Sequence, residues 1–172
     1  MSFLKRLLLK FKNLLFKIKN SKRAIFGKNV VLLGIHNIFL EGVDKNIEIG
    51  DFVRIQASRK IKIGSNSFVG HNNHILGGVT IGDYFMSGPN VCIVGGNHGI
   101  RNINTPMAKQ SIMKTKGIEI GNDVWIGANS TVIDGVTIAD HCVIGAGSVL
   151  TKNTIEWGMY AGNPAKLIKI RV

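Results

Sequence analysis

Aliphatic residues recur every six positions along most of this 172-residue chain. The period matches neither the 3.6-residue repeat of a helix nor the two-residue alternation of an ordinary strand. It matches a short strand followed by a tight turn, so that three such segments form one 18-residue coil. The aliphatic series comprises Ile49, Ile55 and Ile61, then Ile63, Val69, Ile75, Ile81, Ser87 and Ile93, and finally Ile120, Ile126, Val132, Ile138, Ile144 and Leu150. The sequence therefore predicts an all-β solenoid with these residues stacked inside it.

A second inward-facing series lies two positions before several of these residues. It comprises Val124, Ser130, Val136, Cys142 and Ser148. The repeat is broken between Ile93 and Ile120, where residues 94–117 contain Asn, Gly, Pro and Lys without any aliphatic period. A tight solenoid has no room for such a segment, so we expect a loop ejected at about 94–117. Long loops of this kind in compact domains are commonly functional.

The basic charge is concentrated at the N-terminus. Residues 1–28 contain nine basic and no acidic residues, which leaves only +3 of the net charge of +12 for the rest of the chain. A nearly balanced body gives no reason to expect a nucleic-acid partner. Residues 3–18 place most of their large apolar side chains on one face of a helix, and Leu9 and Phe16 fall outside it. That face comprises Phe3, Leu4, Leu7, Leu8, Phe11, Leu14, Leu15 and Ile18.

We therefore expect two domains, a basic amphipathic helix in residues 1–28 and a solenoid in residues 29–172. Two interpretations of the helix remain open. It packs against the protein's own body or trimer, or residues 1–22 lie on an anionic membrane surface. The two cysteines, Cys92 and Cys142, form no CxxC pair, which argues against a disulfide scaffold and a thiolate zinc site. The expected location is cytoplasmic, including the inner face of the cytoplasmic membrane.

Three motifs resemble those of the hexapeptide-repeat acyltransferases. They are PNVCIVGGNH at 89–98, EIGNDVWIGANSTVIDGVTIADHCVIGAGSVLTKN at 119–153 and AGNPAKLIKI at 161–170. The chain is most similar in pattern to the galactoside, maltose and xenobiotic acetyltransferases and to sugar O-acetyltransferases of polysaccharide synthesis. Over residues 29–172 the resemblance implies a left-handed parallel β-helix and a homotrimer with active sites between subunits. It also implies acetyl-CoA as co-substrate and no metal.

The resemblance assigns His98, at the start of the ejected loop, as the catalytic general base. An imidazole suits the task because its ordinary pKa lies close to neutral pH. Carried over residue by residue, the coenzyme contacts are Ala128, Ala146, Thr151, Lys152, Lys166 and Lys169. The candidate acceptor contacts are His71, Asn72, Asn73, His74 and Asn97.

The expected function is acetyl-CoA-dependent O-acetylation of a sugar or glycolipid during synthesis of a surface polysaccharide or lipopolysaccharide. Within the same reaction class, a xenobiotic acetyltransferase of the chloramphenicol or streptogramin type and an amino-sugar N-acetyltransferase stay open. More distant alternatives are a γ-type carbonic anhydrase and a non-catalytic scaffold. The repeats predict the fold and the donor, and leave open the acceptor, the length of the acyl group and any regulation.

Overall fold

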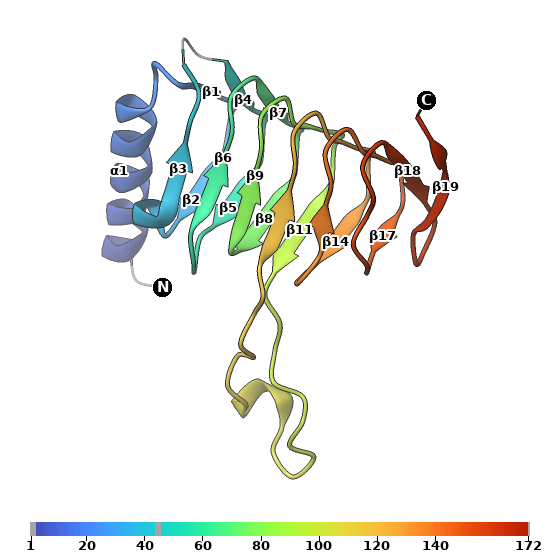
Figure 1. The fold of residues 1–172 in the computed structure, drawn as a ribbon. Coiled ribbons are helices and arrows are strands. Elements are labelled where there is room, and N and C mark those ends of the chain that lie inside the picture. The colour runs from blue at the N-terminus through green and yellow to red at the C-terminus, as the bar shows by residue number, and fades with distance from the viewer. Residues whose placement is uncertain (1–2, 44–45, 172) are drawn as a thin grey trace.

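The chain forms a parallel β-solenoid with three flat faces, seen here in a computed structural model that describes residues 3–43 and 46–171 (Figure 1). Each face is one sheet. Sheet A contains β1 (Ala24–Phe26), β4 (Ile47–Ile49), β7 (Ser67–Val69), β10 (Met86–Ser87), β13 (Trp125–Ile126), β16 (Val143–Ile144), β18 (Gly158–Ala161) and β19 (Lys166–Ile170). Sheet B contains β2 (Val31–Leu33), β5 (Arg54–Gln56), β8 (His74–Gly77), β11 (Cys92–Gly95), β14 (Thr131–Ile133) and β17 (Val149–Leu150). Sheet C contains β3 (Ile38–Leu40), β6 (Ile61–Ile63), β9 (Val79–Ile81), β12 (Ile118–Ile120) and β15 (Thr137–Ile138).

The predicted interior is confirmed. Every member of the six-residue aliphatic series is at most 3% exposed, and so is every member of the second inward series. The serines among them are buried without losing their hydrogen bonds, because Ser130 Oγ donates to the Gly145 carbonyl at 3.0 Å. Apolar stacking along the solenoid axis therefore supplies the core, and the predicted hexapeptide-repeat β-helix is the observed architecture.

Strand register shows where the loop leaves the solenoid. Ile75 pairs with Ile93, 18 positions along, whereas Ile93 pairs with Val132, 39 positions along. The difference of 21 residues is extruded as the ejected loop, which projects away from the coils (Figure 1) and contains the short 3₁₀ helix η2 (Met107–Lys109). The loop is confirmed with one adjustment, because residues 94 and 95 are still part of β11.

Helix α1 (Phe3–Lys19) lies across the first coil and covers that end of the solenoid (Figure 1). The first strand begins at Ala24, so the solenoid starts inside the segment 1–28 that was expected to be helical. Asn13 attaches the helix to the edge strand β2. Its Nδ2 donates to the Leu32 carbonyl at 2.7 Å, and the Leu32 N–H donates to its Oδ1 at 2.6 Å. This reciprocal pair satisfies backbone groups at a strand edge that would otherwise be open.

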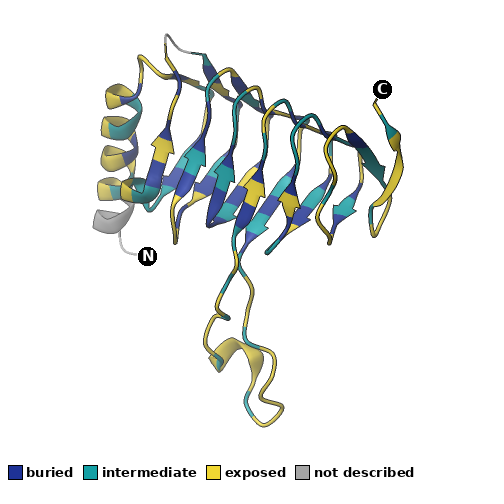
Figure 2. Cartoon of the chain, viewed as in Figure 1, coloured by how far each residue is buried: buried dark blue, intermediate teal, exposed yellow. Residues whose placement is uncertain are grey.

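The helix packs through its polar face. Leu9, Asn13, Phe16 and Asn20 face the body, and Phe16 contacts Phe26 edge-on with ring centroids 6.4 Å apart. These include the two apolar residues that lie off the predicted stripe. The stripe itself, described from Leu7 onward, is 50–59% exposed over Leu7, Leu8, Phe11, Leu14, Leu15 and Ile18 (Figure 2). Among the described residues, no helix is both long and apolar enough to cross a bilayer.

Replacing Asn13 by alanine should destabilise the protein by about 2 to 3 kcal/mol. The substitution leaves the buried N–H and C=O of Leu32 without partners, and the lost hydrogen bonds carry that cost. Alanine is the better helix former, so helix propensity cannot account for a loss. Chemical denaturation measures the effect, with the exposed Lys12→Ala on the same helix as control, expected within about 0.5 kcal/mol of wild type. Equal stability of the two variants would contradict the anchoring role of Asn13.

Candidate active site

His98 lies at the edge where sheet B turns into sheet C, which we call the B–C edge. It follows the end of β11 by three positions, and its backbone forms an isolated antiparallel bridge with Ile112 on the returning arm of the ejected loop. Its backbone N–H donates to Asn97 Oδ1 at 2.9 Å, and its side chain is exposed. The residue therefore presents its imidazole to solvent from a backbone fixed on both arms of the loop.

A cavity of about 630 Å³ opens beside His98. Its lining comes from the ends of strands in sheet B and from both arms of the loop: Gln56, Ser58, Arg59, Leu76, Gly77, Val94, Gly95, Gly96, Asn97, His98, Ile112, Met113, Lys114 and Thr115. Arg59 ties the loop to the solenoid, since its Nη1 donates to both the backbone carbonyl and the Oγ1 of Thr115 at 2.8 Å. Gly77 has a φ of +91°, and a side chain there would collide with the carbonyl of Gly95, so the floor of the cavity admits only glycine.

Sequence reasoning missed Arg59. Its only signal is its position at RKIKIG, where the repeat shifts register and the chain turns toward the third face. Asn97, by contrast, lies in the cavity wall beside His98, so this predicted acceptor contact does share the cavity.

The predicted coenzyme residues Ala128 and Ala146 lie at a different edge, where sheet A turns into sheet B, which we call the A–B edge. They sit one above the other on successive coils, because a Cβ added to Gly127 would touch the Ala146 backbone, and the Gly147 N–H donates to the Ala128 carbonyl at 2.8 Å. No atom lies within 4 Å of a Cβ built on Gly147. This edge is a column of small residues with open space beside it, over which a ligand backbone can lie closely.

The other predicted coenzyme residues do not all share that edge. Thr151 and Lys152 follow β17 and lie exposed on the B–C edge, two strands beyond the His98 strand in sheet B. Lys166 and Lys169 lie exposed on β19, which pairs antiparallel with β18 at the C-terminal end of sheet A. A coenzyme touching all six residues cannot be held by one edge of one chain.

One chain does not bring His98 to Ala128. Strands β11 and β14 are parallel neighbours in sheet B, with Cys92 opposite Thr131. Ala128 precedes the start of β14, whereas His98 follows the end of β11. The two residues therefore lie at opposite edges of sheet B, separated by the whole width of the face.

The candidate acceptor residues in GHNNH are also separated from His98. His71 lies on the A–B edge, where its Nδ1 accepts from the Asp51 N–H at 2.9 Å, and His74 lies at the start of β8, the end remote from His98. Asn72 is a corner residue with a φ of +57°, and its Nδ2 donates to Asn90 Oδ1 at 2.6 Å. These positions place the three residues across a face from the cavity of the same chain.

Asn73 requires a correction. It is 2% exposed, its Nδ2 donates to Ser87 Oγ at 2.6 Å, and its Oδ1 accepts from the Val91 N–H at 2.6 Å. Its amide is thus spent on interior hydrogen bonds and cannot reach an acceptor outside the solenoid. The signal was present in the sequence, because Asn73 lies two positions before Ile75, in the register of the second inward series.

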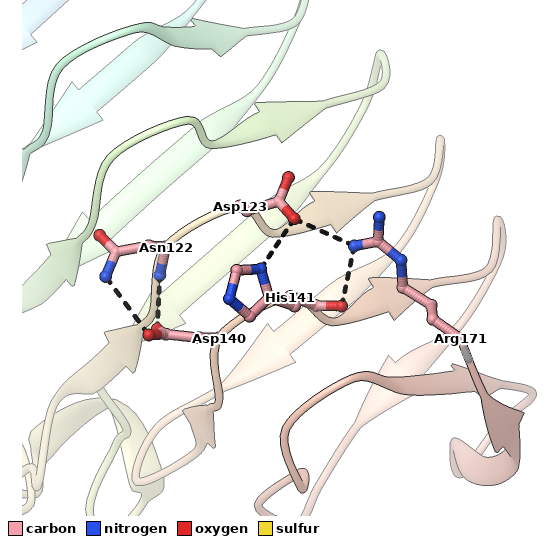
Figure 3. Close-up of polar contacts among 5 residues, drawn as sticks. All are labelled: Asn122, Asp123, Asp140, His141 and Arg171. Carbon is pink, nitrogen blue, oxygen red and sulfur yellow. Dashed lines mark hydrogen bonds and ion pairs between the residues drawn. The ribbon is translucent and has the colours of Figure 1, made fainter.

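The third edge, between sheets C and A, carries a polar cluster (Figure 3). Asp123 Oδ2 lies 2.9 Å from His141 Nδ1 and 3.1 Å from Arg171 Nη1, and Asn122 beside it hydrogen-bonds to Asp140. The hydrogen bond from His141, supported by that from Arg171, holds the pKa of the Asp123 carboxyl below its ordinary value. Because Arg171 follows β19, the cluster fastens the C-terminal strand to the coils. No three His, Cys, Asp or Glu side chains in residues 3–43 and 46–171 are grouped as metal ligands.

Known proteins similar in sequence agree with the repeat. Residues 117–152 match the family described as bacterial transferase hexapeptide (six repeats), and residues 60–84 match the hexapeptide repeat of succinyl-transferase. The galactoside O-acetyltransferase of Escherichia coli K12 is 35% identical over 74% of this chain, and the match spans 62% of its own length. A probable macrolide acetyltransferase of Lysinibacillus sphaericus is 34% identical over 77% of this chain and 68% of its own length. A putative lipopolysaccharide biosynthesis O-acetyl transferase of E. coli K12, WbbJ, is 28% identical, with coverages of 88% and 74%.

Solved structures share the fold. A point mutant of AntD, an N-acyltransferase from Bacillus cereus in complex with dTDP and coenzyme A, superposes with a TM-score of 0.71 at 23% identity. The superposition covers 91% of this chain and 88% of that chain. The β-solenoid, the hexapeptide matches and the relatives above 30% identity together show that the chain belongs to the hexapeptide-repeat acyltransferases.

Proposed function

We propose that the protein is an acetyl-CoA-dependent acetyltransferase that O-acetylates a sugar of a surface polysaccharide or lipopolysaccharide. The observation that carries the proposal is His98, which stands exposed at the mouth of the 630 Å³ cavity with its backbone fixed by the loop. Among the described residues, no hydrogen bond engages its ring, so the imidazole is free to work on a ligand. The sugar acceptor is supported by the sequence similarity to galactoside O-acetyltransferase and to WbbJ.

His98 would act as general base. It removes the proton of the acceptor hydroxyl as that oxygen attacks the thioester carbonyl, and it returns the proton to the departing CoA thiolate. The acceptor oxygen gains the acetyl group, the C–S bond breaks, and no oxidant or metal enters the balance. A backbone N–H on the Ala128 edge is suited to hold the negative charge that develops on the carbonyl oxygen.

The working form that we propose is a homotrimer. The B–C edge with His98 and the A–B edge with Ala128 would come from neighbouring subunits, which resolves their separation within one chain. The outward side of sheet B supports this arrangement, because it carries apolar residues such as Leu76, Val94 and Ile133, whereas sheet C presents polar ones such as Lys62 and Glu119. Exposed apolar patches of this kind are typical of subunit interfaces.

Acetyl-CoA would lie between the two edges. The small residues Ala128, Ala146 and Gly147 leave room for its pantetheine arm, and Lys152, Lys166 and Lys169 are exposed and able to neutralise its phosphates. Lysine supplies charge without the two parallel hydrogen bonds that an arginine gives to phosphate. The complex of AntD with coenzyme A supports the choice of donor on the same fold.

Release of free CoA thiol from acetyl-CoA tests the proposal. The full-length protein would be assayed against simple sugars, nucleotide sugars, amino sugars, lipid-linked sugars and chloramphenicol. We expect turnover with a sugar hydroxyl. Turnover confined to chloramphenicol would favour the xenobiotic alternative, and turnover confined to amino sugars would favour N-acetylation. Failure to bind acetyl-CoA would overturn the acyltransferase assignment of this chain.

A further inference from the structure

The outward face of α1 is the most extensive apolar surface that the proposed reaction leaves without a role. Six large side chains, Leu7, Leu8, Phe11, Leu14, Leu15 and Ile18, form a continuous stripe along it and are each at least half exposed. The stripe faces away from the coils, at the N-terminal end of the solenoid (Figure 2). An exposed stripe of this size on an otherwise polar helix marks a contact surface.

The orientation of the stripe is fixed by specific bonds on the opposite face of the helix. Asn13 pairs with the Leu32 backbone, and Lys17 Nζ donates to the Val30 carbonyl at 3.2 Å and lies 5.9 Å from the centre of the Phe26 ring. Burial of Lys17 against the coil lowers the pKa of its ammonium group. A helix that served only to close the solenoid would turn its apolar stripe onto the open core. This helix turns it outward and attaches through asparagines.

The charges beside the stripe identify the occupant. At 100° per residue, Lys12 and Lys19 flank the stripe on one side and Lys10 on the other, and all three are exposed. The first acidic residue of the chain is Glu41. A second copy of this helix would bring the same positive residues together, which opposes pairing. A surface that is apolar inside and negatively charged outside complements both features, and an anionic bilayer is such a surface.

We propose that the outward face of α1 binds an anionic lipid bilayer and that the solenoid then stands end-on from the membrane. His98 follows the fourth strand of sheet B, counted from the helix. Three strand spacings of about 4.8 Å and a helix diameter of about 10 Å put His98 roughly 25 Å from the lipid contact. Trp125 and Trp157 lie on still later coils, so they stay clear of the bilayer.

Vesicle flotation of the full-length protein tests the surface. We expect binding to vesicles of roughly 30% phosphatidylglycerol in phosphatidylcholine, an anionic surface of the kind that basic amphipathic helices recognise. The double variant Phe11→Gln/Leu15→Gln keeps good helix formers and should weaken binding on the order of 30-fold, the effect of removing two half-exposed apolar side chains. Lys10→Gln/Lys12→Gln should weaken it by a similar factor, at about tenfold per lysine. The control Arg101→Gln/Lys109→Gln removes the same charge from the ejected loop and should bind like wild type.

The orientation has its own measurement. With brominated lipids, the native fluorescence of Trp125 and Trp157 should not be quenched, and Phe11→Trp should add a quenched component. Quenching of the native tryptophans would overturn the end-on arrangement. Equal binding by wild type and Phe11→Gln/Leu15→Gln would overturn the surface. So would a change in oligomeric mass of that variant without a change in vesicle binding, since the occupant would then be a second copy. Neither assay contains acetyl-CoA or an acceptor, so both are independent of the proposed acetyl transfer.

Discussion

Replacement of His98 by alanine is expected to lower turnover by roughly 10²- to 10⁴-fold, the range typical of losing a general base. The affinity for acetyl-CoA should change little, because the predicted coenzyme residues lie on other strands and, for Ala128 and Ala146, on another edge of the solenoid. Steady-state release of CoA thiol measures the first quantity, and calorimetric titration with acetyl-CoA measures the second.

His36→Ala is the matched control for His98→Ala. His36 is also an exposed histidine, but it lies in η1 (Ile35–Asn37) on the first coil, next to α1. Its replacement should leave turnover at the wild-type level. If His98→Ala kept near-wild-type turnover, another residue would have to be the base. If both variants lost turnover equally, the loss would reflect damage to the fold.

Truncation of Ile81 to alanine should cost about 2 to 5 kcal/mol of unfolding free energy, the usual range for a fully buried isoleucine. Ile81 is 0% exposed and stacks between Ile63 and Ile120, on the two sides of the level at which the loop leaves the solenoid. Each coil of a solenoid contacts only its neighbours, so a cavity here weakens the junction between the two halves of the stack.

Denaturation at fixed protein concentration measures the Ile81→Ala effect, since subunit association shifts apparent stability. Ile103→Ala removes the same carbon atoms from a residue that is 93% exposed in the ejected loop, and it should lie within about 0.5 kcal/mol of wild type. A small effect of Ile81→Ala would mean that the coils above and below collapse to fill the space.

The solenoid interior and the loop were predictable because both are properties of spacing along the chain. A residue such as Ile126 stacks on Ile144 because each coil returns after 18 positions, so the period in the sequence is the stack in space. The same logic places Asn73 inside, and its assignment as an acceptor contact failed because residue type was given more weight than register. Arg59 gave no such signal, since its partner Thr115 lies 56 positions away across the loop.

By itself, the sequence determined the β-helix, its core, the ejected loop and the family motifs, since each depends on near neighbours or on a fixed period. Only the tertiary structure decided which face of α1 packs and which edge carries each site residue. Amphipathic patterning identifies the apolar face of a helix, but its packing face is set by partners such as Leu32 and Phe26, and these come from distant strands. Edges depend on coil lengths summed along the chain, and the early coils return after 23 and 20 positions before settling at 18.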